Sequence, residues 1–206
     1  MNNLDKLISL FESFPGVGAR QAKRFAFHVL TMPEADSKEL SRLVAELKGS
    51  VVECVSCHRF YATQQGDTCS ICTSANRDHN RLLVVERDSD VQAIERAGVY
   101  DGLYFILGGT APLLNQGENT KLRAGALKAT VETRLPEGLS EIILGFSINP
   151  DGENTARFVE SVLDPVLEGT EVKLSYLGRG LSTGSELEYA DPETIKNALQ
   201  NRASHT

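Results

Sequence analysis

Four cysteines in two close pairs are the residues of this chain with the clearest chemistry. Two residues separate Cys54 from Cys57 and Cys69 from Cys72, and eleven residues lie between the pairs. Two such pairs present four sulfur ligands at the spacing that a tetrahedral Zn²⁺ requires. Because four sulfurs close the coordination shell, the sequence predicts one structural zinc ion per chain.

Other uses of these cysteines fit less well. A redox dithiol needs one pair, normally at the start of a helix in a βαβ unit, and this segment lacks that context. Two disulfide bonds would not persist in a reducing compartment. His58 and His79 could each replace a cysteine as ligand, although surface positions suit both. Since the segment has little apolar sequence to bury, we expect it to unfold without the metal.

A second group of residues could bind phosphate. The run from Phe14 to Arg24 places a Pro-Gly-Val-Gly turn between two helical patterns, which is typical of a helix-hairpin-helix. Gly16 and Gly18 would let backbone N–H groups and a helix N-terminus approach a DNA phosphate. Three basic residues follow the turn: Arg20, Lys23 and Arg24. Sequence-independent, salt-sensitive DNA binding is predicted. An ordinary helical corner with a solvated basic face is the alternative.

Acidic residues follow two expected strands. Glu86 ends the strand 82–86, and Asp151 and Glu153 come after the strand 141–146. Ligands usually bind at this edge of an α/β sheet. One acid followed by a D-x-[DE] pair resembles the Toprim arrangement, which holds Mg²⁺ for phosphodiester chemistry. A Toprim fold is therefore expected, with Mg²⁺ binding left open. Asp88 and Asp90 could equally cap the next helix.

A glycine-rich run covers residues 178–191 (Gly-Arg-Gly-Leu-Ser-Thr-Gly-Ser-Glu-Leu-Glu-Tyr-Ala-Asp). It could cradle a phosphate, but it lacks the lysine of a Walker A loop. A turn-rich segment before a final helix over about 192–201 explains it equally well.

Helices must position the hairpin and a sheet must position the acids. Apolar residues recur at helical spacing over 4–14, over 19–30 and after Asp36. Asn2 or Asn3 would cap the first helix and Asp36 the third. We expect the third helix to bury one apolar face, formed by Leu40, Leu43, Val44 and Leu47.

After residue 81, apolar strands alternate with helices over about 89–97, 120–135 and 154–167, which predicts a mostly parallel sheet covered on both faces. The fold class is thus a multi-module α+β chain. The expected modules are a helical domain (1–53), a four-cysteine zinc finger (54–80), a Toprim domain (81–177) and a C-terminal segment with a helix (178–206).

The charge divides the chain in two. The 206 residues carry a net charge of −7, which by itself argues against an ordinary basic DNA-binding protein. Residues 1–53 have seven basic and seven acidic residues, whereas residues 81–206 have 12 and 19. The hairpin region is therefore neutral, so each subunit should bind DNA weakly and several hairpins should act together. No apolar run could span a bilayer and no secretory signal is evident, so we expect a cytoplasmic protein.

The order of these modules resembles the RecR family of bacterial recombination mediators over essentially the whole chain. The most specific pieces are 14–28, the four cysteines, 84–86, 102–109 and 187–191. The resemblance implies a non-enzymatic DNA-repair protein, associated with the nucleoid, that forms a homotetrameric ring able to encircle DNA. It also implies that RecO and RecF are partners in loading recombinase onto gapped DNA.

The chain departs from the family pattern in the Toprim segment. Residues 108–112 read Gly-Gly-Thr-Ala-Pro without a serine before the proline, and residues 151–153 read Asp-Gly-Glu where the family has Glu-Gly-Glu. These changes leave partner affinity and metal binding there open. A Mg²⁺-dependent Toprim enzyme of primase-like or nuclease-like type and a pure protein-interaction scaffold are the alternative functions.

Overall fold

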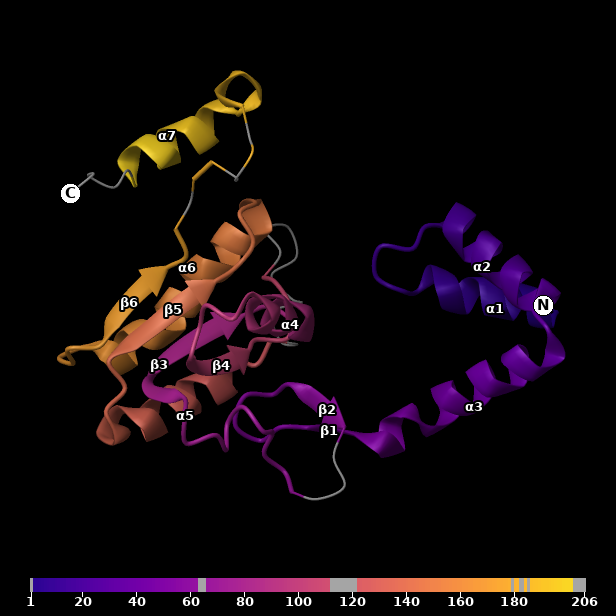
Figure 1. Cartoon of the computed structure of the whole chain (residues 1–206), viewed down its shortest axis with the longest axis horizontal. Helices are drawn as coiled ribbons and strands as arrows, with labels where there is room; N and C mark the ends of the chain where they lie inside the picture. Colours follow the sequence, from indigo (N-terminus) through magenta and orange to yellow (C-terminus); the bar gives the residue numbers. More distant parts are fainter. Residues whose placement is uncertain are drawn as a thin grey trace. The chain divides into compact units, whose positions relative to one another are not determined.

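The computed structural model describes residues 2–62, 66–111, 122–178, 180–181, 184 and 186–201. The chain divides into two compact units, Met1–Val52 and Glu53–Thr206 (Figure 1). The finer division predicted at residues 80 and 177 stays a prediction. Some residues singled out in the sequence lie outside the described residues: Pro112, Arg179, Ser182, Thr183 and Ser185.

The first unit contains α1 (Asn3–Glu12), α2 (Ala19–Thr31) and α3 (Glu34–Ser50). The predicted cap of α1 is confirmed at Asn2, whose side-chain oxygen accepts a hydrogen bond from the Asp5 N–H at 2.9 Å. The Asp5 carboxylate accepts from the Asn2 N–H in return, which completes a capping box.

Small residues on α2 let it pack closely against α1. Ala22 and Ala26 are fully buried. The ring of Phe11 meets those of Phe14 and Phe25 edge to face, with centroids 5.7 and 5.8 Å apart. These contacts fix the two helices on either side of the turn, so the hairpin geometry follows from the α1–α2 interface.

The third helix differs from the prediction in two ways. It begins at Glu34 directly after Pro33, so Asp36 lies in its first turn and does not cap it. A proline without an N–H costs nothing at a helix start, where that donor has no partner. The expected burial of its apolar face is also wrong. Leu43 and Val44 are 52% and 66% exposed, and Leu40 and Leu47 are exposed too, because no described element of the first unit packs closely against them.

The second unit is built on a four-stranded parallel sheet in the order β4-β3-β5-β6. Its strands are β3 (Asp78–Val85), β4 (Gly102–Ile106), β5 (Glu141–Gly145) and β6 (Lys173–Tyr176). In register, Val84 of β3 lies between Phe105 and Leu144. The predicted parallel sheet is therefore confirmed.

Helices connect these strands and cover both faces of the sheet (Figure 1). They are α4 (Asp88–Ala97), α5 (Ala124–Arg134, continued by the 3₁₀ turn η2, Leu135–Glu137) and α6 (Pro150–Leu167). Right-handed crossovers place α4 on one face and α5 and α6 on the other, because β4 and β5 flank β3 on opposite sides. In agreement, α5 packs against α6 and α4 against β3.

The cysteine segment lies in the same unit and shares its core. Its strand β2 (Phe60–Ala62) forms a two-stranded sheet with β1 (Val51–Glu53), which spans the boundary between the units. Cys54, Cys57, Cys69 and Ile71 belong to the same buried cluster as β3 and β4. The segment therefore has a hydrophobic anchor that its own composition did not indicate. The chain continues through the 3₁₀ turn η3 (Leu187–Tyr189) to α7 (Pro192–Gln200).

Candidate metal centre and nucleic-acid interface

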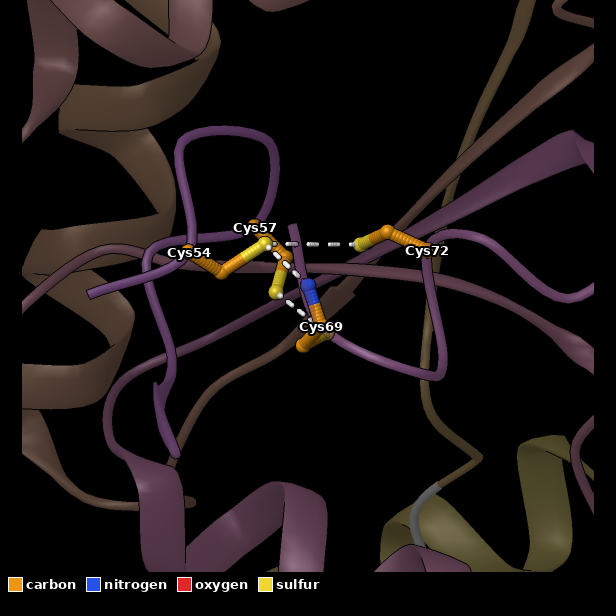
Figure 2. A group of neighbouring side chains, drawn as sticks. All are labelled: Cys54, Cys57, Cys69 and Cys72. Carbon is orange, nitrogen blue, oxygen red and sulfur yellow. Dashed lines mark hydrogen bonds between the residues drawn. The ribbon is translucent and has the colours of Figure 1, made fainter. Parts of the chain in front are cut away.

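The four cysteine side chains converge on one point. Their sulfur atoms all lie within 4.8 Å of one another (Figure 2). The sulfurs of Cys57 and Cys69 are 3.6 Å apart and those of Cys54 and Cys72 are 3.9 Å apart. Three of the four are almost fully buried, and Cys72 is partly exposed. This donor set fits a tetrahedral metal ion bound through sulfur alone.

The Cys54 sulfur also accepts a backbone hydrogen bond. The Cys69 N–H donates to the Cys54 sulfur at 3.3 Å. Such donors stabilise thiolates, which are the form that binds a metal.

Hydrogen bonds among the cysteines divide their proton affinities. Those from Cys57 and Cys72 hold the pKa of the Cys69 thiol far below its ordinary value. Hydrogen bonds to Cys69 and Cys72, together with burial, raise the pKa of Cys57 well above its ordinary value.

Hydrogen bonds connect the cysteine segment to β4 and α4. The Ile106 N–H donates to the carbonyl of Cys57 at 2.9 Å. The Phe60 N–H donates to the Asp88 carboxylate at 2.7 Å, so Asp88 at the start of α4 ties down the segment. Asp90, in the first turn of α4, accepts from the N–H of the N-cap residue Arg87 at 2.8 Å.

Neither histidine joins the cysteine group among the described residues. His58 contacts Glu53 through Nδ1 at 2.7 Å and meets the ring of Phe105 edge to face. Its φ of 62° is unusual for a residue with a side chain, and these contacts hold it there. His79 contacts the carbonyl of Ser74 at 3.2 Å.

The hairpin presents an open helix N-terminus. Gly16 has a φ of +77°, and the Val17 N–H closes the turn onto the Phe14 carbonyl at 3.1 Å. Gly18 is the N-cap of α2, where no side chain caps the helix. A Cβ at Gly18 would meet nothing within 4 Å. No side chain therefore occupies the first N–H groups of α2, as an anion site requires.

Three cations surround this helix start. Arg20, Lys23 and Arg24 are exposed. None of the ion pairs formed by the described residues involves them. They line an open groove together with Phe27 and His28. The hairpin pattern alone does not indicate Phe27. Its helical spacing from Arg20 and Arg24 is the signal that places it on the same face of α2.

The predicted Toprim acids have separate surroundings. Glu86 is 6% exposed and accepts a hydrogen bond from the Ser147 N–H at 2.7 Å. Asp151 and Glu153 lie in the first turn of α6, which begins at Pro150, four residues before the predicted start. Asn149 caps that helix by accepting from the Gly152 N–H at 2.8 Å.

Among the described residues, the cysteines are the only group of three or more potential ligands that lie close enough to hold one metal ion. The structure thus brings the predicted cysteine ligands together. It does not assemble the three predicted acids in this way, and their role stays a prediction. No described helix is both long and apolar enough to span a bilayer.

Three family models match the chain. They are "RecR, helix-hairpin-helix" over residues 4–47, "Toprim domain" over 80–178 and "RecR, C-terminal" over 180–203. The chain is 32% identical over 198 residues to the recombination protein RecR of Lactobacillus helveticus, covering 96% of this chain and 95% of the relative. It is 36% identical over 201 residues to that of Bifidobacterium animalis subsp. lactis, covering 97% and 94%. It is 32% identical over 203 residues to that of Chlorobium luteolum, covering 98% and 97%.

Proposed function

The chain belongs to the RecR family of recombination proteins, and from this we propose that it is a DNA-binding recombination mediator without catalytic activity of its own. Its partners are gapped DNA, RecO and RecF, and its task is to help load recombinase. It acts as a homotetrameric ring in the cytoplasm, at the nucleoid. The open N-terminus of α2 with its three cations carries this proposal.

DNA binding at this site needs no base recognition. A phosphate oxygen accepts from the free N–H groups at the start of α2, with Gly16 and Gly18 keeping side chains out of the way. Arg20, Lys23 and Arg24 add charge contacts to neighbouring phosphates. All these contacts address the DNA backbone, so binding is independent of sequence and weakens steeply as salt rises.

Zinc is the metal proposed for the cysteine centre. Four sulfur ligands favour Zn²⁺ and leave no position for a substrate, so the ion is structural. When bound, it neutralises part of the charge of four thiolates. The chain's own contacts, such as the Ile106 N–H to the Cys57 carbonyl, then hold the closed segment against β4.

Assembly with further copies is supported by α3. Its face of Leu40, Leu43, Val44 and Leu47 is exposed, and no described element of the first unit packs closely against it. A stripe at this spacing is what a helix buries against another helix. A second copy supplies such a helix, and a ring of copies would bring several hairpins to one DNA molecule.

The acidic residues at the carboxyl ends of the strands fit a mediator better than an enzyme. One oxygen of the buried Glu86 accepts from the Ser147 N–H, so this carboxylate holds the loop between β5 and α6. The surface at this edge, including the exposed Gly108 and the partly exposed Gly109 and Thr110, is the place proposed for contact with the protein partners.

DNA binding by the zinc-loaded protein tests the proposal. Replacing Arg20, Lys23 and Arg24 together by alanine should weaken binding to gapped DNA and lower the slope of log K against log salt by about one for each cation removed. The matched control replaces three cations of α3, namely Lys38, Arg42 and Lys48. Absence of DNA binding by the unaltered protein at low salt would contradict the proposal, and so would a Mg²⁺-dependent nicking activity that Glu86→Gln abolishes.

A further inference from the structure

One face of α2 combines cations with an aromatic ring. Its residues recur at helical spacing, so they share one side of the helix: Arg20, Lys23, Arg24, Phe27, His28 and Thr31. The opposite side carries Ala22 and Ala26, which are fully buried. The face is therefore fixed by the packing of α2 on α1, and Phe27 lies at its centre.

Phe27 differs from the other rings of this unit. The ring of Phe11 contacts those of Phe14 and Phe25 edge to face. Phe27 is 52% exposed, and none of the ring contacts among the described residues includes it. Its i−3 and i−4 neighbours, Arg24 and Lys23, are cations outside every ion pair of the described residues.

Charge decides what can cover this ring. A second copy of the same face would bring Arg20, Lys23 and Arg24 against their own counterparts, which costs energy. A nucleic-acid strand instead brings phosphates to the cations, and its bases offer flat surfaces to the ring. Exposed aromatic side chains beside a basic track are the means by which proteins bind single strands without reading sequence.

We propose that Phe27 stacks on an unpaired base, so that this face selects the single-stranded part of gapped DNA; the inference rests on the proposed DNA binding by α2. Seven residues of helix place Phe27 about 10 Å along the axis from Arg20. A strand held by its phosphates at the start of α2 therefore passes the ring. In duplex DNA the bases are stacked on one another and cannot meet the ring, so duplex binding uses the cations alone.

Two DNA probes separate stacking from charge. One is an oligothymidine strand and the other is an abasic strand of equal length, which has the same phosphates and no bases. Phe27→Leu should weaken oligothymidine binding about tenfold, within the range known for loss of one base–aromatic stack, and leave abasic binding unchanged. Arg24→Gln should weaken binding of both strands.

The outcomes distinguish this inference from the proposed function. If the unaltered protein binds neither strand, DNA binding itself fails. If Phe27→Leu weakens both strands equally or leaves both unchanged, stacking is overturned. If Phe27→Leu changes the mass of the assembly measured by light scattering, the phenyl ring of Phe27 contacts another copy of the chain. The inference is then overturned as well.

Fluorescence gives an independent test because the chain contains no tryptophan. Phe27→Trp introduces a single indole, whose emission should be quenched by oligothymidine and not by the abasic strand. Phe60→Trp is the matched control, since Phe60 in β2 is also 52% exposed. Equal quenching of both variants, or none of the Phe27→Trp protein at saturating strand, would overturn the inference.

Discussion

The two glycines of the hairpin turn meet different needs. Gly16 has a positive φ of 77°, a conformation that side chains disfavour. Gly18 has a φ of −87°, which any residue adopts, and its surroundings are empty. The first glycine therefore serves the fold and the second serves access to the helix N-terminus.

Substituting each glycine by alanine should separate these needs. Gly16→Ala should lower the free energy of unfolding by about 1 kcal/mol because of its backbone strain. Gly18→Ala should leave stability nearly unchanged and weaken DNA binding severalfold, because its methyl group enters the space over the open N–H groups. Urea unfolding and DNA titration measure the two effects. Loss of stability with intact DNA binding in Gly18→Ala would refute the assignment.

A half-buried ion pair joins the cysteine segment to α4. Glu95 accepts hydrogen bonds from Arg77 and, at 2.6 Å, from the hydroxyl of Tyr104. The Arg77 guanidinium is the main cause that lowers the pKa of Glu95 below its ordinary value of 4.5. Because the folded-state pKa is depressed, the stability that it contributes is present above pH 4.5 and is lost as pH falls through the folded value.

Glu95→Gln should reveal this dependence. The variant should be less stable than the parent at neutral pH, by about 1 kcal/mol, and the difference should shrink below pH 4.5. Glu137→Gln, at an exposed position in η2, is the control. It should change neither the stability at neutral pH nor its dependence on pH. Chemical unfolding at a series of pH values measures both, and a difference that is constant with pH would speak against the ion pair.

Residue types and spacing were enough to predict the cysteine group and the hairpin. They did not indicate that Asp88 anchors β2 rather than capping α4, because the contact joins positions 28 residues apart. The acidic triad was predicted from strand ends alone. The hydrogen bond that orients Glu86 toward Ser147 depends on the loop after β5, which no local pattern describes.

At the scale of elements, the spacing of apolar residues after residue 81 predicts which segments form strands and helices. It predicts the ends of these elements less well. Helix α6 starts at Pro150 because Asn149 caps it and proline suits the first helical position. Gly152 is needed there, since a Cβ would clash with the carbonyl oxygen of Ser147. The Asp-Gly-Glu run is therefore helical and tightly packed rather than a loop.

Removal of the metal should destabilise the cysteine segment before the rest of the second unit. The cysteine segment has a short sheet and a buried anchor in the core of the second unit, but its four thiols come together around one point. A strong chelator, or Cys69→Ser, should release the metal, increase amide exchange in residues 53–77 and lower the unfolding temperature by about 5 °C or more.

Metal analysis of the purified protein checks the same assignment. It should find one zinc ion per chain before chelation, and zinc added back should restore the unfolding temperature. Calcium or magnesium should not, since neither prefers sulfur ligands. An unchanged unfolding temperature in the metal-free protein would show that the hydrophobic anchor is sufficient.

For the whole molecule, charge and exposed apolar surface lead to the same expectation. The chain has a net charge of −7, and a single hairpin carries three cations, so one copy should hold DNA weakly. Joining several hairpins in one assembly raises the binding strength without new contacts. The sequence predicted the α3 stripe but not its exposure, because periodicity shows that a face is apolar and not what covers it.

A charge placed in the α3 stripe should test whether assembly supplies this strength. Leu43→Glu puts a carboxylate into a face that is already exposed in the single chain, so its helix content should be unchanged. The assembly should fall to a smaller mass in light scattering, and affinity for gapped DNA should drop at least tenfold although the hairpin is intact. Ala45→Glu adds the same charge on another side of α3 and should alter neither mass nor affinity. The proposed assembly should dissociate on dilution, so the affinity of the unaltered protein should approach that of Leu43→Glu at low protein concentration. If Leu43→Glu binds DNA as tightly as the parent while having the mass of one chain, a single hairpin suffices and the ring is not needed for binding.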